Sequence, residues 1–389
     1  MEQRALGAVV NAEEAAPRRL ASLTGLRWLA AFGVFGFHLL TNQTMTGDPG
    51  FVQALDVLFG GGASGVSLFF VLSGLVLTWS ARPGDRPVPF WRRRIARVVP
   101  VHVVTWLCVL ASLALVGHEL SAGPALAGLV LLQSWVPDEA YYFAVNTPAW
   151  SLACEVFFYA VFPWLLALVR RVPERRRWLL VVGLVGGVWA VSAVAVLMPE
   201  PRAYWFVAIF PVTRLLEFAL GICLALMVRD GHWRGPGVGV SAGLVAVAYF
   251  AAGHVPPPWG WVAWMVGPLA LLVAALAAAD ARRGRGLLRR PALVRLGEIS
   301  FAFYLVHQPV IRLGTRLVGD DLHVVAVVAV SAGMLLVSVG LAWLLFRFVE
   351  RPMERRLRPT DGGRGDGGCR DGGRGDGGRR DGGREVVGR

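Results

Sequence analysis

Charged side chains are scarce in this chain of 389 residues, and lysine is absent altogether. Only 17% of the residues are charged, whereas 55% are hydrophobic, a balance that excludes one or two ordinary soluble domains. Cysteine is also rare, and its spacing is too wide for a zinc site, a redox motif or a disulfide framework; the four positions are Cys108, Cys154, Cys223 and Cys369. No metal site is expected, and the composition predicts an all-α, polytopic membrane helical bundle.

Long apolar runs make up most of the sequence. A run of about 17–25 apolar residues is long enough to cross a bilayer as a helix. The chain has ten such runs, at residues 22–40, 61–80, 97–117, 149–169, 177–197, 204–228, 237–253, 259–279, 296–318 and 323–348. A further apolar stretch, Pro124–Trp135, is too short to cross, and we expect it to form a re-entrant or interfacial helix.

The charges between these runs alternate in sign along the chain. Every second connection is rich in arginine, as in residues 82–97 and 282–295, and the other connections carry mainly aspartate and glutamate. Because positive loops face the cytoplasm, this alternation predicts a multi-pass protein of the cell membrane with both termini in the cytoplasm. The net charge of +13 then reflects topology in the lipid bilayer, and a nucleic acid partner is not expected.

The two ends of the chain differ from its apolar middle. Residues 1–19 form a charged segment, which the topology places in the cytoplasm, and residues 20–352 form the membrane domain. Residues 353–389 are basic and rich in glycine, arginine and aspartate, a composition that cannot bury a core. We expect this tail to be a disordered cytoplasmic appendage.

The first apolar run carries one ionisable group near each end. Arg27 and His38 are eleven residues apart, so a helix places them on nearly the same face, roughly 16 Å apart along its axis. One elongated ligand could contact both. An ionisable side chain deep in a membrane is a functional-site hypothesis; the alternative is that Arg27 anchors the helix and His38 bonds to a neighbour.

The run 149–169 places polar groups on one helix face. Ser151, Glu155 and Tyr159 repeat every four residues, so a carboxylate lies at membrane depth with a hydroxyl one turn to either side. Trp150 lies beside them in sequence. Each polar group at this depth needs a partner or a function.

The run 296–318 carries a second set, Ser300, Tyr304 and His307, at spacings of four and three. His307 falls about as deep in the membrane as His38. Two mid-membrane histidines at matched depth favour a function more strongly than one.

At two further places in the sequence a structural role stands beside a chemical one. Arg214 and Glu217 are three residues apart, which favours a structural salt bridge on one helix face. Ser73 precedes Gly74 at a point where helices could approach closely, and helix packing explains this hydroxyl at least as well as catalysis.

An arginine cluster precedes the third apolar run. Arg93 and Arg94 lie four and three residues before Arg97, so a helix presents the three as a cationic face at the membrane surface. Such a face suits a polyphosphate, although a topology anchor or a contact with lipid head groups would look the same.

Seven stretches, in order along the chain, match the motifs of one family: Arg27–His38, Phe70–Gly74, Arg93–Pro100, Trp150–Tyr159, Arg214–Gly221, Leu296–Pro309 and Glu350–Pro352. Over most of Leu20–Pro352 the sequence resembles the acyltransferase 3 family of integral membrane O-acyltransferases, in its stand-alone branch without a fused hydrolase-like domain. The resemblance implies an acyl-coenzyme A donor that enters from the cytoplasm, an essential histidine in the first run, and a carbohydrate or glycosylated acceptor. Ser67 departs from the family, which often has an aspartate there.

We therefore expect an acyl group, acetyl or another short one, to move from acyl-coenzyme A to a hydroxyl of a carbohydrate, glycolipid or glycosylated metabolite. Acyl-coenzyme A acts as a co-substrate, and no tightly bound cofactor is expected. His38 is the expected general base, and Glu155 orients a histidine or the acceptor. The expected donor-binding residues are Arg27, Arg93, Arg94 and Arg97, and the expected substrate-binding or supporting residues are Ser73, Trp150, Ser151, Tyr159, Arg214, Glu217, Tyr304 and His307.

Two other classes of protein use the same residue types. Mid-membrane histidine, glutamate and arginine also build proton relays, so a proton-coupled transporter or flippase of a polar or lipid-linked substrate is the alternative. A sensor that binds an acyl donor or lipid without catalysis is a third reading. A transporter would favour internal repeats with interrupted helices, and the sequence shows no convincing repeat.

Overall fold

The computed structural model describes residues 20–41, 45–82, 84–117, 119–282, 284–319 and 322–357, and within these ranges it contains helices and no strand. The expected N-terminal segment and most of the expected C-terminal tail lie outside the described residues. The last described residues form a helix that runs to Leu357, so helical structure extends beyond residue 352.

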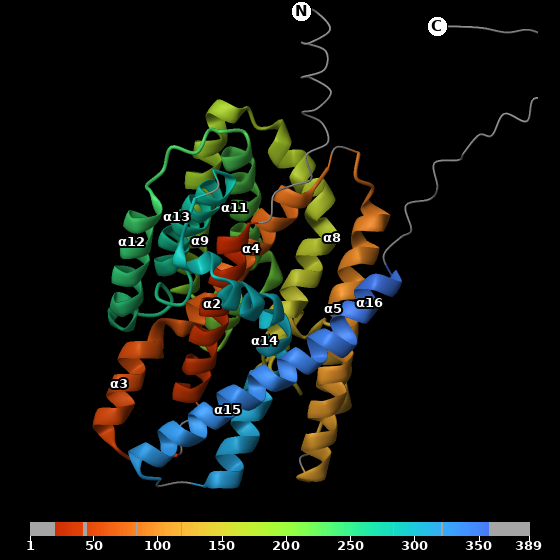
Figure 1. The fold of residues 1–389 in the computed structure, drawn as a ribbon, viewed down its shortest axis with the longest axis vertical. Coiled ribbons are helices and arrows are strands. Elements are labelled where there is room, and N and C mark those ends of the chain that lie inside the picture. The colour runs from red at the N-terminus through yellow and green to blue at the C-terminus, as the bar shows by residue number, and fades with distance from the viewer. Residues whose placement is uncertain are drawn as a thin grey trace, which may run out of the picture. The chain divides into compact units, whose positions relative to one another are not determined.

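Helices follow one another along the whole described chain (Figure 1). The longer ones are α2 (Ala21–Thr41), α3 (Pro49–Phe59), α4 (Gly65–Ser80), α5 (Pro87–Leu115), α6 (Ala122–Leu129), α8 (Ala149–Arg171), α9 (Arg177–Ala195), α11 (Pro211–Arg229), α12 (Val238–Ala251), α13 (Ala263–Ala281), α14 (Pro291–Val318), α15 (Val324–Leu345) and α16 (Arg351–Leu357). The shorter turns are α7 (Glu139–Tyr142), α10 (Arg202–Tyr204), η1 (Gly60–Ser64), η2 (Gln133–Trp135), η3 (Glu174–Arg176), η4 (Trp205–Ile209), η5 (Ala252–His254), η6 (Leu287–Arg289) and η7 (Phe346–Glu350).

Each predicted apolar run contains one long helix: α2, α4, α5, α8, α9, α11, α12, α13, α14 or α15. Within the described residues, 8 helical segments are long and apolar enough to cross a membrane. The helices of the other two predicted runs fail this length and hydropathy test for different reasons. α12 has only 14 residues, and α14 carries several charged side chains along its 28 residues. The polytopic helical bundle is confirmed, and the number of ten crossings stays a prediction.

Glycines allow the central helices α4 and α11 to pack backbone against backbone. A methyl group added at Gly74 would overlap the carbonyl oxygen of Phe218, and one added at Gly221 would overlap that of Val71. Small residues are the usual means by which membrane helices approach so closely. Ser73 therefore lies at a close helix contact, as its neighbouring glycine indicated, and the same contact fixes the turn of α4 that carries it.

The start of α2 is held by a buried carboxylate from α13. Asp280 accepts hydrogen bonds from the Ser22 backbone N–H at 2.8 Å and from the Ser22 hydroxyl at 2.7 Å. These bonds satisfy donors that a helix leaves unpaired in its first turn. Gly25 then packs against the Leu288 carbonyl. The axial position of α2, and with it the depth of Arg27 and His38, is thereby set.

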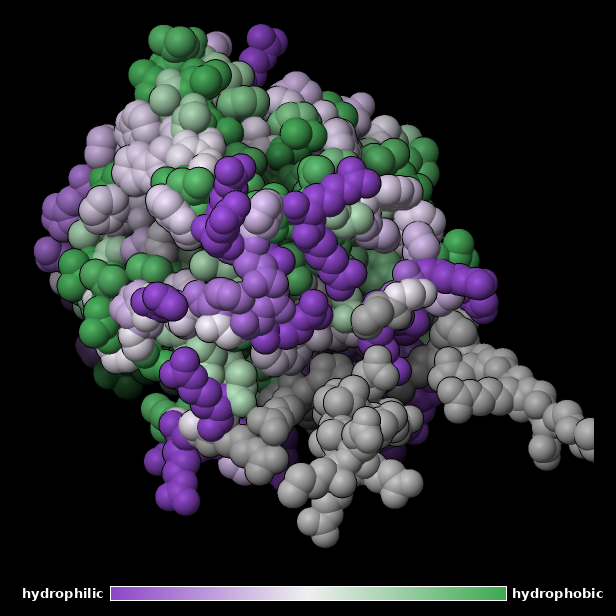
Figure 2. Space-filling view, turned by 90° about the horizontal axis from the view of Figure 1, so that it is seen from above, coloured by the Kyte–Doolittle hydropathy of each residue, from purple (hydrophilic) through white to green (hydrophobic). Residues whose placement is uncertain are grey.

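The arginine-rich connections gather at one end of the bundle. The link between α4 and α5 and the link between α8 and α9 both lie at the top of Figure 1. Figure 2 looks onto this end and shows many hydrophilic side chains on it. Their common location agrees with the charge alternation in the sequence, which places all of these connections on the same side.

The short apolar stretch after α5 does not form a crossing helix. α6 ends at Leu129, and the chain then turns through Leu131, whose φ is +59°. The side chains of Gln133 and Ser134 are buried and donate to the carbonyls of Ala149 and Trp150, at 3.0 and 2.8 Å. This segment includes the predicted short helix, and its two hydrogen bonds hold the start of α8 in place.

We expect Gly221→Ala to lower the thermal unfolding midpoint of the detergent-solubilised protein, because the added methyl group must push α4 and α11 apart at a cost of about 1–3 kcal/mol. Gly183→Ala in α9 is the matched control, since its added methyl group meets nothing within 4 Å. That change should leave the midpoint unchanged or raise it, because alanine favours helices over glycine. Equal shifts in the two variants would contradict the packing argument.

Candidate active site

One cavity opens between α2, α4, α5, α8 and α14. The cavity and its mouth hold about 880 Å³ of empty space. Its wall is mostly apolar, with polar groups at a few points; the polar lining residues are Arg27, Ser73, Arg94, Arg97, Ser151, Glu155, Tyr159, Ser300 and Tyr304. Five separate motifs of the sequence thus contribute to one space, because long-range packing brings their helices together.

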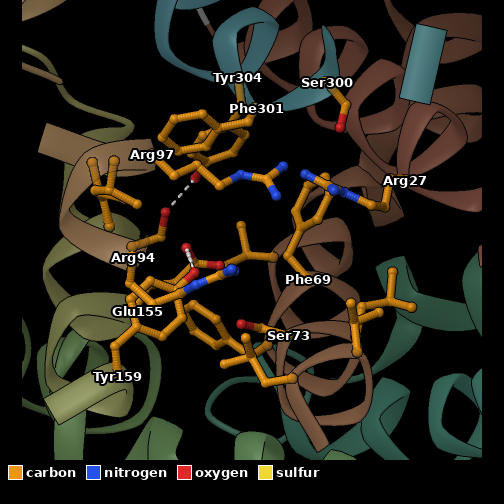
Figure 3. Close-up of a pocket in the computed structure, with 18 of the residues that line it drawn as sticks. Arg27, Phe69, Ser73, Arg94, Arg97, Glu155, Tyr159, Ser300, Phe301 and Tyr304 are labelled. Atoms are coloured by element: carbon orange, nitrogen blue, oxygen red, sulfur yellow. Dashed lines mark hydrogen bonds between the residues drawn. The ribbon is translucent and has the colours of Figure 1, made fainter. Parts of the chain in front are cut away.

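Three arginines face this cavity. Arg27 comes from α2, and Arg94 and Arg97, one helical turn apart, come from α5. The guanidinium groups of Arg27 and Arg97 point toward each other across the cavity (Figure 3). Arg93 does not line the cavity, because a helix turns it about 100° away from Arg94. The predicted cationic face is therefore real but is made by Arg94 and Arg97 together with Arg27.

Arg97 is also tied to the end of the described chain. Its Nε lies 3.5 Å from Glu350 and 3.8 Å from Glu354. The Glu350 side chain is only 2% exposed, and it belongs to the π-helical turn η7 just before α16. Sequence reasoning noted the Glu-Arg-Pro motif here but assigned it no role, because the partner lies more than 250 positions earlier.

The carboxylate of Glu155 pairs within its own helix. The Tyr159 hydroxyl donates to Glu155 Oε2 at 2.8 Å, as their spacing of four residues allows. Ser73 from α4 faces the same part of the cavity (Figure 3). The hydrogen-bond partner of Glu155 is thus a tyrosine, and not a histidine as one of the predicted roles required.

The two histidines that the sequence predicts at matched depth form a pair, with His38 in the last turn of α2. His38 Nδ1 lies 2.8 Å from His307 Nε2, and His307 Nδ1 lies 3.2 Å from the Phe303 carbonyl oxygen. A carbonyl only accepts, so His307 carries its proton on Nδ1 and its Nε2 must accept from His38. His38 then donates through Nδ1, which places the basic lone pair of its neutral ring on Nε2.

Tyr304 stands between the cavity and the histidine pair. Its side chain lines the cavity, its hydroxyl accepts from Ser151 Oγ at 2.9 Å, and its ring centre lies 5.7 Å from that of His307. His38 itself is not part of the cavity wall. Arg27 and His38 therefore share a helix face as predicted, but only Arg27 borders the cavity, and the pair lies beyond Tyr304.

A family model described as an acyltransferase domain, that of acyltransferase family 3, matches residues 20–347. The chain belongs to this family. Three curated relatives show the same relationship. The acyltransferase MdmB of Streptomyces mycarofaciens is 43% identical over 87% of this chain and 92% of its own length. The exopolysaccharide production protein ExoZ of Rhizobium meliloti is 31% identical over 76% of this chain and 91% of its own.

The third relative is the peptidoglycan O-acetyltransferase OatA of Listeria monocytogenes, 25% identical over 86% of this chain and 56% of its own length. No solved structure matches. The family and these relatives make the chain an enzyme that transfers acyl groups, and its apolar helices make it a multi-pass membrane protein. The enzyme is thereby favoured over the transporter and the sensor.

Outside the cavity, the acyltransferase contains a buried ion pair. Arg214 Nη1 lies 3.0 Å from Glu217 Oε2, with side chains 3% and 1% exposed. Arg214 also donates to Ser67 Oγ at 3.3 Å and lies over the Phe70 ring. The predicted salt bridge is present, and Ser67, where the family often has an aspartate, is a neutral partner of this arginine.

Trp150 likewise lies outside the cavity wall. Its ring packs edge-on against Phe70, with ring centres 6.4 Å apart, and its carbonyl accepts from Ser134. Both contacts hold the start of α8, so Trp150 supports the helix that carries Ser151 and Glu155.

Glu217→Leu alone should destabilise the acyltransferase by about 3–5 kcal/mol, because it leaves the Arg214 charge buried without its counter-ion. The double change Arg214→Leu with Glu217→Leu should recover much of that loss, since no buried charge remains. Thermal unfolding in detergent measures both. The exposed pair Arg351–Glu298, 3.8 Å apart with side chains 46% and 35% exposed, is the control, and breaking it should cost at most about 1 kcal/mol. A double variant no better than the single one would refute this account.

Proposed function

We propose that this enzyme moves a short acyl group, acetyl or a close relative, from acyl-coenzyme A to a hydroxyl of a carbohydrate or glycosylated acceptor, with His38 as the general base. The observation that carries the proposal is the cavity with three converging arginines, whose wall includes Tyr304, a side chain that packs against His307 of the hydrogen-bonded histidine pair. This chemistry requires a cationic binding site for the phosphates of the donor and a general base for the acceptor hydroxyl.

The cavity suits the donor in both charge and shape. Guanidinium groups bind phosphate oxygens with paired hydrogen bonds, and Arg27, Arg94 and Arg97 supply three of them. The remaining wall is largely apolar, with Phe69, Phe70 and Phe301 among its residues, which favours the uncharged arm and a short acyl chain. In this proposal the nucleotide end lies at the arginines and the thioester lies toward Tyr304.

The arginine-rich end of the bundle sets the direction of entry. Positive connections face the cytoplasm in a cell membrane, where acyl-coenzyme A is made. The termini would then be cytoplasmic, and the donor would reach the arginines without crossing the bilayer. Arg97 keeps its orientation through Glu350, whose carboxylate holds Nε and leaves the two terminal nitrogens of the guanidinium for phosphate.

The acyl transfer itself needs one proton to move twice. His38, held by the hydrogen bond from its Nδ1 to His307, takes the proton of the acceptor hydroxyl at Nε2 while the oxygen attacks the thioester carbonyl carbon. The new C–O bond replaces the C–S bond, and the departing thiolate takes the proton back as free coenzyme A. General base catalysis of this kind contributes about 10²–10⁴-fold.

The relatives indicate the class of acceptor. Their names point to peptidoglycan and exopolysaccharide, both of which are carbohydrates rich in hydroxyl groups. We therefore place the acceptor among envelope carbohydrates, glycolipids and glycosylated metabolites. The Glu155 carboxylate, which accepts from the Tyr159 hydroxyl in the cavity, would offset part of the charge of the arginines beside the donor.

Mass spectrometry of envelope carbohydrate and of extractable glycosylated metabolites tests the reaction. Cells that carry the intact chain should show an acyl mass increment, and cells with His38→Ala or with no copy should lack it or retain less than about 1% of it, because the base contributes at least about 10²-fold. Membrane levels of the variant must match those of the intact chain. An equal increment from both chains would remove His38 from the chemistry, and no increment from either would remove the proposed reaction.

Coenzyme A titration of the purified protein tests the donor site. Arg94→Gln removes one charge-assisted contact, worth about 1.5–3 kcal/mol, so the concentration needed to raise the unfolding midpoint should increase about 10-fold or more. Arg93→Gln, one position away but outside the cavity wall, should leave it unchanged. If the two variants behaved alike, phosphate binding by the cavity arginines would be wrong.

A further inference from the structure

Two helix-interior prolines lie next to the candidate site, Pro163 in α8 and Pro309 in α14. Proline has no backbone N–H, so it cannot donate to the carbonyl four residues earlier. The carbonyls that lose their donor are those of Tyr159 and Leu305, and both residues line the cavity. In a membrane helix such a carbonyl must be satisfied from elsewhere.

Side chains from other segments supply the missing donors. Trp91 Nε1 donates to the Tyr159 carbonyl at 3.0 Å, and Asn146 Nδ2 donates to the Leu305 carbonyl at 3.1 Å. Each proline thus creates an acceptor at the site, and a residue far away in sequence occupies it. The second of these contacts lies only two residues from His307.

The backbone around Asn146 has an unusual conformation that orients this amide. Asn146 is 1% exposed. The preceding residue, Val145, has a φ of +56°, which is unusual for a β-branched side chain and persists only where the surroundings enforce it. Val145 is itself buried and packs against Trp106 and Val109 of α5. The fold therefore keeps a strained backbone at the point that directs Asn146 toward α14.

Only the donor half of the Asn146 amide has a partner. Its nitrogen bonds to Leu305, while its buried Oδ1 has no hydrogen-bond partner among the described residues. The bond to the Leu305 carbonyl is therefore the hydrogen bond that the Asn146 side chain makes within the described residues. A second bond, from Ser151 Oγ to the Tyr304 hydroxyl at 2.9 Å, ties the same stretch of chain to the same turn of α14.

We propose that Asn146 is a positioning residue. By replacing the donor that Pro309 removes, its amide fixes the turn of α14 that carries Tyr304 at the cavity wall and His307 against His38. The inference rests on the proposed function, in which His38 is the base. It predicts that Asn146 governs the rate of transfer and leaves donor binding, which depends on arginines of α2 and α5, unaffected.

Two single variants separate the rate from donor binding. Asn146→Ala removes the amide, and Asn146→Asp keeps its shape but replaces the donor with an acceptor oxygen. In membranes supplied with radiolabelled acetyl-coenzyme A, both should slow acyl transfer about tenfold, as expected for a buried carbonyl left unpaired. Stabilisation of the purified protein by coenzyme A should stay within about twofold in concentration. Unchanged transfer, or an equal loss of coenzyme A binding, would overturn the proposal.

A double-mutant cycle tests the link to Pro309. Pro309→Ala restores a backbone N–H that can donate to Leu305, so Asn146→Ala should cost less than about threefold in that background. Pro163→Ala is the matched control, because it restores a donor to a different carbonyl, and there the full effect of Asn146→Ala should remain. If Asn146→Ala slowed acyl transfer by the same factor in the Pro309→Ala and Pro163→Ala backgrounds, Asn146 would not act through Leu305.

Thermal unfolding midpoints of the same four proteins test the same coupling without any measurement of acyl transfer. Asn146→Ala should lower the unfolding midpoint of the otherwise native chain and change it little when Pro309 is alanine. This measurement holds even if Pro309→Ala itself abolishes transfer. The measurement also separates the two proposals. If the two substitutions are coupled in their unfolding midpoints but the intact chain transfers no acyl group, the contact between Asn146 and Leu305 stands and the proposed reaction is refuted. If the chain transfers an acyl group but the midpoints show no coupling, the reaction stands and the role of Asn146 is refuted.

Discussion

A polar group between apolar membrane helices must find its partner inside the protein, because no water is there to replace it. This constraint organises the acyltransferase. Arg214 is paired with Glu217, Glu155 with Tyr159, and His38 with His307. At the carbonyls that Pro163 and Pro309 deprive of a donor, a side chain takes its place. The pairs that join different elements, such as His38 with His307 and Asn146 with the Leu305 carbonyl, thus fix the helices to one another beside the proposed site.

Much of the fold could be predicted from the sequence because the signals are local. Apolar runs located the long helices, although α5 begins ten residues before its run and α11 begins seven residues into its run. A run such as Pro124–Trp135 was recognisably too short to cross. Pairs three or four residues apart were equally accessible, since helix geometry alone brings Arg214 to Glu217 and Glu155 to Tyr159. These predictions required only the pitch of a helix and the thickness of a bilayer.

The remaining features depend on how helices pack, which no local pattern encodes. His38 and His307 could be matched in depth, but their hydrogen bond requires α2 and α14 to face each other. The pairing of Arg97 with Glu350 joins α5 to the end of the chain. The orientation of α5 decides that Arg94 and not Arg93 lines the cavity, and the packing of α14 places Tyr304 both at the cavity wall and against His307. Each outcome is set by a partner remote in sequence.

The ion pair between Arg97 and Glu350 bears on where this kind of domain ends. The family match stops at residue 347, three positions before Glu350 and seven before Glu354. A recombinant fragment cut at the edge of the match would lose both carboxylates and leave a cavity arginine without its counter-ions. The stretch that serves the cavity is therefore longer than the stretch that the family model matches, and a boundary placed at residue 347 would fall inside the working unit.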